Sequence, residues 1–321
     1  MQILVTGGAG FIGSHLCQRL INDGHIVTAL DNFSTGRAAN LESLTKSSNF
    51  TLIQGSILDT NILNSLIKDS EYIFHLAAAV GVFNIVKNPL ASLLTNIRGT
   101  ENVLEAANAA KTPVFLTSSS EVYGKNVSDS LKESDDRILG SPVTLRWSYS
   151  EAKAIDESLA YAYFVEKQLE TRIVRFFNTV GPRQLGAYGM VVPRFVKSAL
   201  ANEPITIYGD GTQTRCFAHV YDVIDAVIAI AFADNTIGKV INVGNDFEIS
   251  INDLAKKIII ETGSKSEIVY VPYEEAYGDG FEDMERRVPN INLINQLVGW
   301  KPKRDLTTII SDISAEMKKN S

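Results

Sequence analysis

The sequence has few of the features that would point to a secreted, nucleic-acid-binding or membrane protein. Two cysteines, Cys17 and Cys216, are too few for a disulfide framework, so we expect both to be reduced in a cytoplasmic protein. The formal net charge is −7, which leaves no basic surface for a nucleic acid. No apolar run is long enough to cross a bilayer, and the first residues lack the charged stretch of a leader peptide. We therefore expect no nucleic-acid or membrane partner, and we predict no metal site.

Linkers, internal repeats and low-complexity segments are also missing. No stretch rich in glycine, serine or proline divides the 321 residues. A chain of this length can bury a sizeable core, and its 45% hydrophobic and 21% charged residues are ordinary for a globular protein. We therefore expect one compact unit in which two unequal lobes are fused.

The first fourteen residues show the order strand, glycine turn, helix. Residues 3–5 form a short apolar run, glycines follow at 7, 8, 10 and 13, and apolar residues then recur at helical spacing from Phe11 to Ile21. In this order the glycines allow a tight turn, a close backbone approach to a pyrophosphate and close packing of helix on strand. The N-terminus of the helix would direct free N–H groups at the phosphates.

A second strand pattern over residues 26–30 ends in Asp31, which lies 18 residues after Gly13. A carboxylate at about this position hydrogen-bonds the ribose of a bound dinucleotide. Because a 2′-phosphate there would meet negative charge, we predict NAD rather than NADP, and Arg37 is the nearby residue that argues the other way. The alternative is a doubly wound sheet that binds no dinucleotide.

Strand and helix patterns alternate along the rest of the chain. In the first half, strand patterns occupy residues 51–54, 72–75, 114–117 and 172–177, and helix patterns occupy 89–110 and 149–168. After residue 181, helix patterns at 190–201, 220–233 and 251–262 alternate with strand patterns at 205–208, 239–243 and 268–271. Such βα units predict an α/β fold with a Rossmann-type doubly wound parallel sheet. We place the cofactor domain at 1–180 and a smaller C-terminal α/β substrate lobe at 181–321, with some strands and helices shared between them.

Tyr149 and Lys153 are four residues apart, which places a phenol and an ammonium on one face of the predicted helix. A free tyrosine, with a pKa of about 10, is a poor base at neutral pH. The positive charges of Lys153 and a nicotinamide would favour the phenolate, which could take a hydroxyl proton while hydride leaves the same carbon. The hydroxyl run from Thr117 to Ser120 could hydrogen-bond both the substrate and Tyr149. The alternatives are a surface Tyr–Lys pair and a serine-rich turn.

Together these motifs resemble the extended short-chain dehydrogenases/reductases, in the branch that acts on nucleotide sugars. The resemblance covers nearly the whole chain, and the combined motifs are highly specific for the family. The residues that carry it lie at 6–13, 31–36, 75–78, 96, 118–124, 149, 153, 175–183, 208–217 and 287–289. It implies NAD as the cofactor and a nucleotide sugar, UDP-linked, as the substrate.

The functional positions of the family transfer to this chain residue by residue. Ser119, four residues before Tyr123, is implied to assist Tyr149. The residues implied to bind NAD, besides Tyr149 and Lys153, are Gly7, Gly10, Phe11, Ile12, Gly13, Asp31, Asn32, Ser34, Thr35, Gly36, Ser56, Ile57, Leu76, Ala77, Ala78, Asn96, Thr117 and Phe176. Those implied to bind the nucleotide sugar are Asn178, Arg183, Val191, Tyr208, Gln213, Arg215 and Arg287. Ser56 is a departure, because many relatives carry an acid there that contacts adenine.

The resemblance leaves three reactions open, each through a 4-keto sugar with NAD regenerated. A C5 carboxylate can leave as carbon dioxide, a C6 hydroxyl can be eliminated as water, or the sugar can turn over and give the 4-epimer. Glu121 favours the first two, because simple 4-epimerases usually lack an acid there, and such an acid can handle protons at C5. The Ser120–Glu121 pair resembles the UDP-glucuronate decarboxylases, where the counterpart of Arg215 is assigned a part near the sugar carboxylate.

We therefore expect decarboxylation of UDP-glucuronate to UDP-xylose, with Tyr149, Lys153, Ser119, Ser120 and Glu121 as the catalytic residues. The alternatives are a UDP-glucose or UDP-hexuronate 4-epimerase and then a nucleotide-sugar 4,6-dehydratase. Glu121 could instead be a structural carboxylate paired with a base in the cleft. Outside the enzymes, the alternative is a non-catalytic NAD-sensing scaffold.

The helix patterns near residues 92–109 and 149–168 carry more apolar residues than one core face needs. Relatives pair these two helices across a two-fold axis into a four-helix bundle. The resemblance therefore implies a homodimer.

Overall fold

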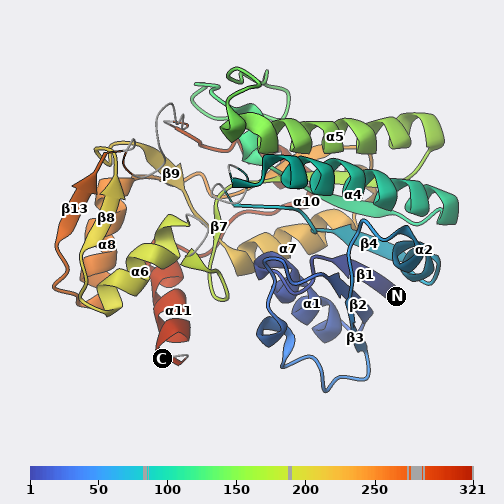
Figure 1. The fold of residues 1–321 in the computed structure, drawn as a ribbon, viewed down its shortest axis with the longest axis horizontal. Coiled ribbons are helices and arrows are strands. Elements are labelled where there is room, and N and C mark those ends of the chain that lie inside the picture. Colours follow the sequence, from blue (N-terminus) through green and yellow to red (C-terminus); the bar gives the residue numbers. More distant parts are fainter. Residues whose placement is uncertain are drawn as a thin grey trace.

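Seven parallel strands form the central sheet, in the order β11–β6–β5–β4–β1–β2–β3 (Figure 1). The computed structural model describes residues 1–81, 85, 87–186, 190–272, 275, 284 and 286–319. The strands of this sheet are β1 (Gln2–Thr6), β2 (Ile26–Asp31), β3 (Phe50–Gln54), β4 (Tyr72–His75), β5 (Val114–Ser119), β6 (Thr171–Phe176) and β11 (Val240–Val243). All neighbouring pairs are parallel, which confirms the predicted Rossmann-type α/β fold.

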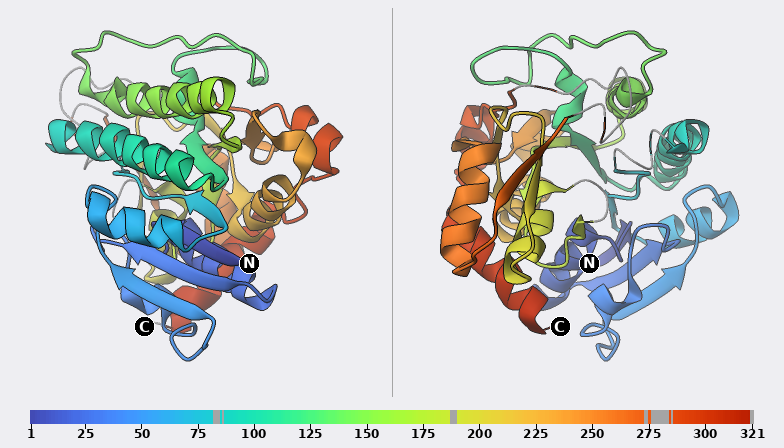
Figure 2. Two further views of the ribbon diagram at one scale, coloured as in Figure 1. Left: turned by 90° about the vertical axis from the view of Figure 1, so that its right-hand side faces the viewer. Right: turned by 60° about the vertical axis from the view of Figure 1, so that its left-hand side comes forward.

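The apolar runs form strands because helices cover both faces of the sheet. In β1, Ile3 and Val5 pack into one hydrophobic cluster, whereas Leu4 points the other way and packs into a second. The first cluster includes side chains of α1 (Phe11–Asn22), α7 (Val220–Ala231) and α10 (Asn292–Val298). The second includes side chains of α2 (Thr60–Lys68), α4 (Pro89–Ala110) and α5 (Ser148–Lys167). Figure 2 shows α4 and α5 side by side in this second layer.

The long helices α4 and α5 have distinct ends. Pro89 begins α4, where its missing N–H costs no hydrogen bond, and Lys111 ends it in the left-handed conformation. Gln168 ends α5 in the same way. Short 3-10 turns lie at η1 (Ala38–Leu41), η2 (Ser120–Tyr123), η3 (Leu145–Trp147) and η5 (Asp234–Thr236). In the part of the chain that the structure describes, no helix combines the length and apolar character needed to span a membrane.

A second lobe lies to the left of the sheet in Figure 1 and has its own core. Helices α6 (Val191–Leu200), α8 (Ile251–Thr262) and α11 (Leu306–Lys319) pack around the parallel strands β8 (Ile205–Tyr208) and β13 (Ile268–Val271). Two further pairs join β7 (Thr179–Val180) to β10 (Ala218–His219) and β9 (Thr214–Cys216) to β12 (Glu248–Ser250). The helix and strand patterns predicted after residue 181 are thus present at their expected places.

Besides α10, two elements of the C-terminal half belong to the main sheet and its helical layer. Strand β11 pairs with β6, with Val240 opposite Ile173, and α7 packs on the face that α1 also covers. The two lobes therefore share elements, and the domain boundary at residue 180 stays a prediction.

Candidate active site

A cavity of about 710 Å³ lies between the sheet and the second lobe. Its lining includes residues that follow β1, β2, β3, β4, β5 and β6, so it opens at the carboxyl ends of the parallel strands. Ligands of open α/β sheets bind at this edge. Residues of β7, α6, β8 and β9 close the opposite side.

The glycine turn after β1 admits no side chains at two positions. Gly7 has a φ of +72°, and a Cβ atom there would lie 2.7 Å from the backbone nitrogen of Ala77. A Cβ atom on Gly13 would lie 2.2 Å from the carbonyl oxygen of Gly7. This close packing brings the first turn of α1 against the strands, and Phe11, Ile12 and Gly13 of this turn line the cavity. The leading N–H groups of a helix have no partner within it. The arrangement fits a pyrophosphate.

Asp31 ties this turn to the end of β2. Its Oδ2 accepts a hydrogen bond from the backbone of Ala9 at 2.9 Å, and its Oδ1 accepts one from the backbone of Phe33 at 2.8 Å. The carboxylate is largely buried and still lines the cavity, where the predicted ribose would lie. Arg37 also lines the cavity and donates a hydrogen bond from Nη2 to Oδ1 of Asn40 at 3.3 Å.

Nearly all of the predicted site residues line this one cavity, and two lie behind its wall. A Cβ atom on Gly36 would lie 2.8 Å from Oδ1 of Asp31, so the absence of a side chain there leaves room for the carboxylate. Asn96 is buried in α4 and holds both backbone groups of Ala79, accepting from the nitrogen at 2.6 Å and donating to the oxygen at 3.2 Å. Ser56 lines the cavity, and its hydroxyl accepts a hydrogen bond from the backbone of Leu58 at 3.2 Å.

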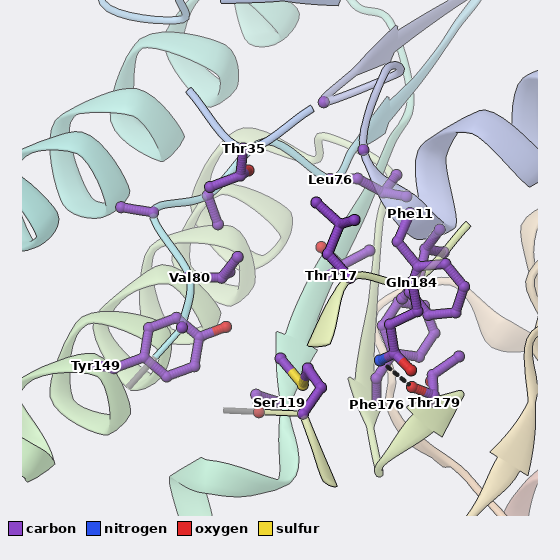
Figure 3. Close-up of a pocket in the computed structure, with 18 of the residues that line it drawn as sticks. Phe11, Thr35, Leu76, Val80, Thr117, Ser119, Tyr149, Phe176, Thr179 and Gln184 are labelled. Carbon is purple, nitrogen blue, oxygen red and sulfur yellow. Dashed lines mark hydrogen bonds between the residues drawn. The ribbon is translucent and has the colours of Figure 1, made fainter. Parts of the chain in front are cut away.

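Tyr149 extends from α5 into the cavity, and Ser119 lies opposite at the end of β5 (Figure 3). Burial raises the pKa of the Tyr149 phenol, the carboxylates of Glu121 and Asp156 raise it further, and a hydrogen bond with Ser119 lowers it. Lys153 lines the cavity as expected, but its Nζ donates to Oδ2 of Asp156 at 2.7 Å. Lys153 was predicted to favour the phenolate, but Asp156 counteracts the charge of this lysine.

Glu121 is held between two guanidinium groups beside Tyr149. Its Oε2 pairs with Nη1 of Arg146 at 2.5 Å and its Oε1 with Nη1 of Arg287 at 2.9 Å. These three side chains are at most 13% exposed. Burial by itself raises the pKa of Glu121, but the two arginines outweigh burial and lower it to about 2. The alternative of a carboxylate paired with a base describes this geometry, and a proton-handling role for Glu121 stays a prediction.

The same cluster places two guanidinium groups in the cavity wall. Two guanidinium groups share one carboxylate, and Arg287 also donates to the hydroxyl of Ser120 at 3.2 Å. Nε of Arg287 is buried and has no hydrogen-bond partner among the described residues. Arg146, Glu121 and Arg287, together called the arginine cluster below, all line the cavity. The cluster can therefore receive an anionic group of a ligand.

The second lobe supplies further polar groups. Nδ2 of Asn178 donates to the carbonyl of Cys216 at 2.9 Å, and Nε2 of Gln213 donates to the carbonyl of Tyr208 at 3.2 Å. Nη1 of Arg215 donates to the carbonyl of Thr214 at 2.8 Å. These contacts fix polar side chains along the cavity wall, where Val191 adds an apolar surface at the start of α6.

Arg183, which the family resemblance implies to bind the nucleotide sugar, lies near α1 and the glycine turn. The carbonyl oxygen of the preceding residue, Pro182, accepts a hydrogen bond of 2.9 Å from Nε2 of His15 in α1. The charge of Arg183 is among the causes that lower the pKa of His15, after burial, to about 4. Nη1 of Arg183 is buried without a hydrogen-bond partner within the described ranges. Its position beside α1 fits a phosphate of the dinucleotide as well as one of the substrate.

Two arginines that line the cavity, Arg146 and Arg194, were not predicted from the sequence. Arg146 lies three residues before Tyr149, and this helical spacing could have indicated that both face the same space. Arg194 in α6 stacks over the ring of Tyr208 at 4.3 Å, and no motif in the sequence signals it. Among the described residues, no group of three or more His, Cys, Asp or Glu side chains could hold a metal ion.

Comparison with known proteins assigns the family. The sequence profile described as GDP-mannose 4,6 dehydratase matches residues 4–313. The chain therefore belongs to this family, which lies within the extended short-chain dehydrogenases/reductases, and the resemblance inferred from the sequence is confirmed.

Two curated relatives and one solved structure show which members of this family the chain is similar to. The UDP-N-acetyl-alpha-D-glucosaminuronate decarboxylase of Bacillus cytotoxicus is 42% identical over 302 residues, which are 94% of this chain and 92% of the relative. UDP-glucuronic acid decarboxylase 1 of Xenopus tropicalis is 37% identical over 94% of this chain and 68% of its own length. Among solved structures, the UDP-glucuronic acid 4-epimerase of Bacillus cereus, in complex with UDP-glucuronic acid and NAD, superposes with a TM-score of 0.90 at 31% identity, covering 100% of both chains.

Proposed function

We propose that this chain is an NAD-dependent UDP-hexuronate decarboxylase that converts UDP-glucuronate into UDP-xylose. The arginine cluster beside Tyr149 is the observation that carries the proposal, because guanidinium groups beside the predicted reacting centre suit a sugar whose C5 bears a carboxylate. The decarboxylases among the relatives support the same conclusion.

The residues at the strand ends fit NAD. The glycine turn and the N-terminus of α1 would hold the pyrophosphate, Asp31 would hold the adenosine ribose, and Tyr149 and Lys153 would lie near the nicotinamide end. Bound NAD would accept hydride from C4 of the sugar and later return it, so that the cycle has no net redox change. The solved epimerase relative binds NAD, which supports this assignment.

Tyr149 and Ser119 would handle the proton of the C4 hydroxyl. Tyr149 takes this proton as the C4 ketone forms, and Ser119 holds the oxygen in line by hydrogen bonding. The carboxylate on C5 is then β to the ketone. The C5–C6 bond breaks, its electron pair passes into the enolate at C4 and C5, and carbon dioxide leaves. A proton from a solvent water then adds to C5, and Tyr149 returns its proton to O4 as the ketone is reduced.

The arginine cluster would position the carboxylate before it leaves. Glu121 holds Arg146 and Arg287 in place, and its pKa of about 2 keeps it ionised at neutral pH. Arg146 and Arg287 both line the cavity, where their guanidinium groups would meet the carboxylate oxygens. A UDP-hexuronate 4-epimerase would need the same charge recognition and is therefore the second candidate, supported by the likeness to the solved epimerase.

The products distinguish these candidates. The purified protein would be incubated with NAD and, separately, with UDP-glucuronate, UDP-N-acetylglucosaminuronate and UDP-glucose, and the products followed by mass spectrometry and proton NMR. We expect the hexuronates to lose the mass of carbon dioxide. Unchanged mass with a new sugar spectrum would identify a 4-epimerase, and loss of water from UDP-glucose would identify a dehydratase. Stabilisation by NAD without any turnover would indicate an NAD-sensing scaffold.

We further propose that the protein is a homodimer, in which α4 and α5 of two copies form a four-helix bundle. Both helices expose apolar side chains: Leu90 in α4 is 68% exposed, and Ile155, Tyr161 and Val165 in α5 are 41%, 51% and 58% exposed. A second copy would remove this surface from water. Sedimentation over a range of protein concentrations tests the proposal, and a monomer mass at every concentration would reject it.

We also infer a cytoplasmic location. Cys17 and Cys216 are both free and buried, and burial raises the pKa of the Cys216 thiol to about 12. Reduced thiols of this kind suit a reducing compartment. Fractionation of the source cells with an antibody to the protein tests the location, and recovery outside the cytoplasmic fraction would refute it.

A further inference from the structure

Asp156 lies behind the catalytic pair and does not line the cavity. Its side chain is 0% exposed, and that of its partner Lys153 is 3% exposed. The two residues are three apart in α5, and the 2.7 Å contact joins Nζ of Lys153 to Oδ2 of Asp156. The ammonium of Lys153 thus lines the cavity, whereas the carboxylate that balances its charge is buried behind the wall.

The second oxygen of Asp156 has no comparable contact. Oδ1 is buried and has no hydrogen-bond partner in the part of the chain that the structure describes. A buried carboxylate with an unsatisfied oxygen is costly, so its presence needs a compensating interaction. The ammonium of Lys153 is that interaction.

The other charged groups near Tyr149 are accounted for. Glu121 on η2 faces the phenol and is paired with Arg146 on η3 and with Arg287. On β4, burial and the charge of Lys153 lower the pKa of His75 to about 3, so the ring is neutral at physiological pH. Asp156 is therefore the remaining carboxylate that raises the pKa of Tyr149, and it is also the group that holds Lys153.

We propose that Asp156 is a positioning residue for the Tyr149–Lys153 pair: it anchors the ammonium from inside the protein and, by counteracting its charge, sets the pH at which Tyr149 gives up its proton. A tyrosine beside an uncompensated ammonium loses its proton at lower pH than one beside an ion pair. Asp156 would thus keep the phenol protonated until a ligand changes the surroundings of Lys153.

The first test is a titration of the protein without cofactor. The near-ultraviolet absorbance of phenolate would be followed against pH in the wild type and in Asp156→Asn, with Tyr149→Phe in each background subtracted. This subtraction isolates Tyr149 from the other tyrosines among the 11 in the chain. We expect Tyr149 of D156N to ionise at a pH lower by roughly one unit. An unchanged titration in the folded variant would overturn the proposal.

A matched control distinguishes a specific effect of Asp156 on Tyr149 from a general loss of fold stability. Asp222 is another buried aspartate, and its Oδ1 pairs with Nη1 of Arg304 away from the cavity. Asp222→Asn should lower stability but leave the titration of Tyr149 unchanged. If D222N moved the Tyr149 titration as far as D156N does, the effect would be non-specific and the proposal would fail. Asp156→Ser removes the same charge with a smaller side chain and decides the question if D156N does not fold.

A second readout uses turnover and rests on the proposed function. The acidic limb of the pH profile of kcat/KM should move to lower pH in D156N, and Asp156→Glu, which keeps the charge, should restore the wild-type limb. A folded D156N with the wild-type profile would contradict the proposal. Absence of turnover in the wild type would refute the proposed function instead, and the cofactor-free titration would still decide the role of Asp156.

Discussion

The two walls of the cavity recognise ligands by different means. The wall beside β1 consists of glycines and backbone groups, in which Gly7 and Gly13 leave no room for a Cβ atom. The other wall, taken here as α6 together with the arginine cluster beside Tyr149, presents the guanidinium groups of Arg146, Arg194 and Arg287. The first wall therefore depends on shape and the second on charge. A change of side-chain size should affect the first most, and a change of charge the second.

The largest expected effect comes from the residue that lies between the two walls. Tyr149→Phe removes the hydroxyl that would accept and return the substrate proton, so turnover of UDP-glucuronate should fall by about 10²- to 10⁴-fold. Binding of NAD, measured by thermal shift, should remain, because the shape-dependent wall is unchanged. Tyr161→Phe, on the exposed side of the same helix, should behave like the wild type. Full activity of Y149F would show that the reaction does not use this phenol.

The second prediction breaks the charged wall. Arg287→Gln removes one of the two guanidinium groups that hold Glu121, so kcat/KM for UDP-glucuronate should fall by about 10- to 100-fold. The neighbouring Arg286 pairs with Glu248 and is 38% exposed, which makes Arg286→Gln a matched control. Steady-state kinetics of both variants check the prediction. Equal losses in the two variants would argue against charge recognition by the arginine cluster.

The third prediction breaks the wall that depends on shape. Gly13→Ala would place a Cβ atom 2.2 Å from the carbonyl oxygen of Gly7, so the glycine turn must shift. We expect a loss of about 1–3 kcal/mol in the free energy of unfolding and weaker NAD binding. Gly24 has a φ of +86° and open space around its Cβ position, so Gly24→Ala should weaken folding through backbone strain alone and spare NAD binding. Chemical denaturation and NAD titration measure both effects, and equal NAD affinity of G13A and wild type would contradict the prediction.

The smallest effect concerns the pH dependence of the arginine cluster. The pKa of Glu121 is lowered from an ordinary value of 4.5 to about 2, so the ionised form stabilises the fold. This contribution is complete above pH 4.5 and is lost as the pH falls through 2. The difference in unfolding free energy between the wild type and Glu121→Gln should therefore be constant above pH 4.5 and shrink below it. A difference that changes between pH 6 and pH 8 would mean that another group titrates.

The contrast between the walls also explains what could be predicted from the sequence. Strands and helices were predictable because Ile3, Leu4 and Val5 sit in a sheet covered on both faces, and the glycine turn was predictable because its residues are consecutive. Of the arginine cluster, Glu121 and Arg287 were predicted as site residues, but Arg146 and the contacts among the three were not, because Glu121 lies 25 residues from Arg146 and 166 from Arg287, and only the fold brings them together. The Lys153–Asp156 contact is an intermediate case. Its i, i+3 spacing is visible in the sequence, but burial, which gives the contact its importance, is not.

The place of β11 at the edge of the main sheet has a consequence for the timing of synthesis. Strand β6 ends at Phe176, whereas its outer partner β11 begins at Val240. While the ribosome is making the intervening residues, the outer N–H and C=O groups of β6 have no strand to pair with. Such an open edge can pair with another nascent chain. A long translational pause between these two strands would therefore leave an aggregation-prone intermediate, and a stop codon there would leave an aggregation-prone fragment. In both cases every segment of the dinucleotide-binding motif is already present.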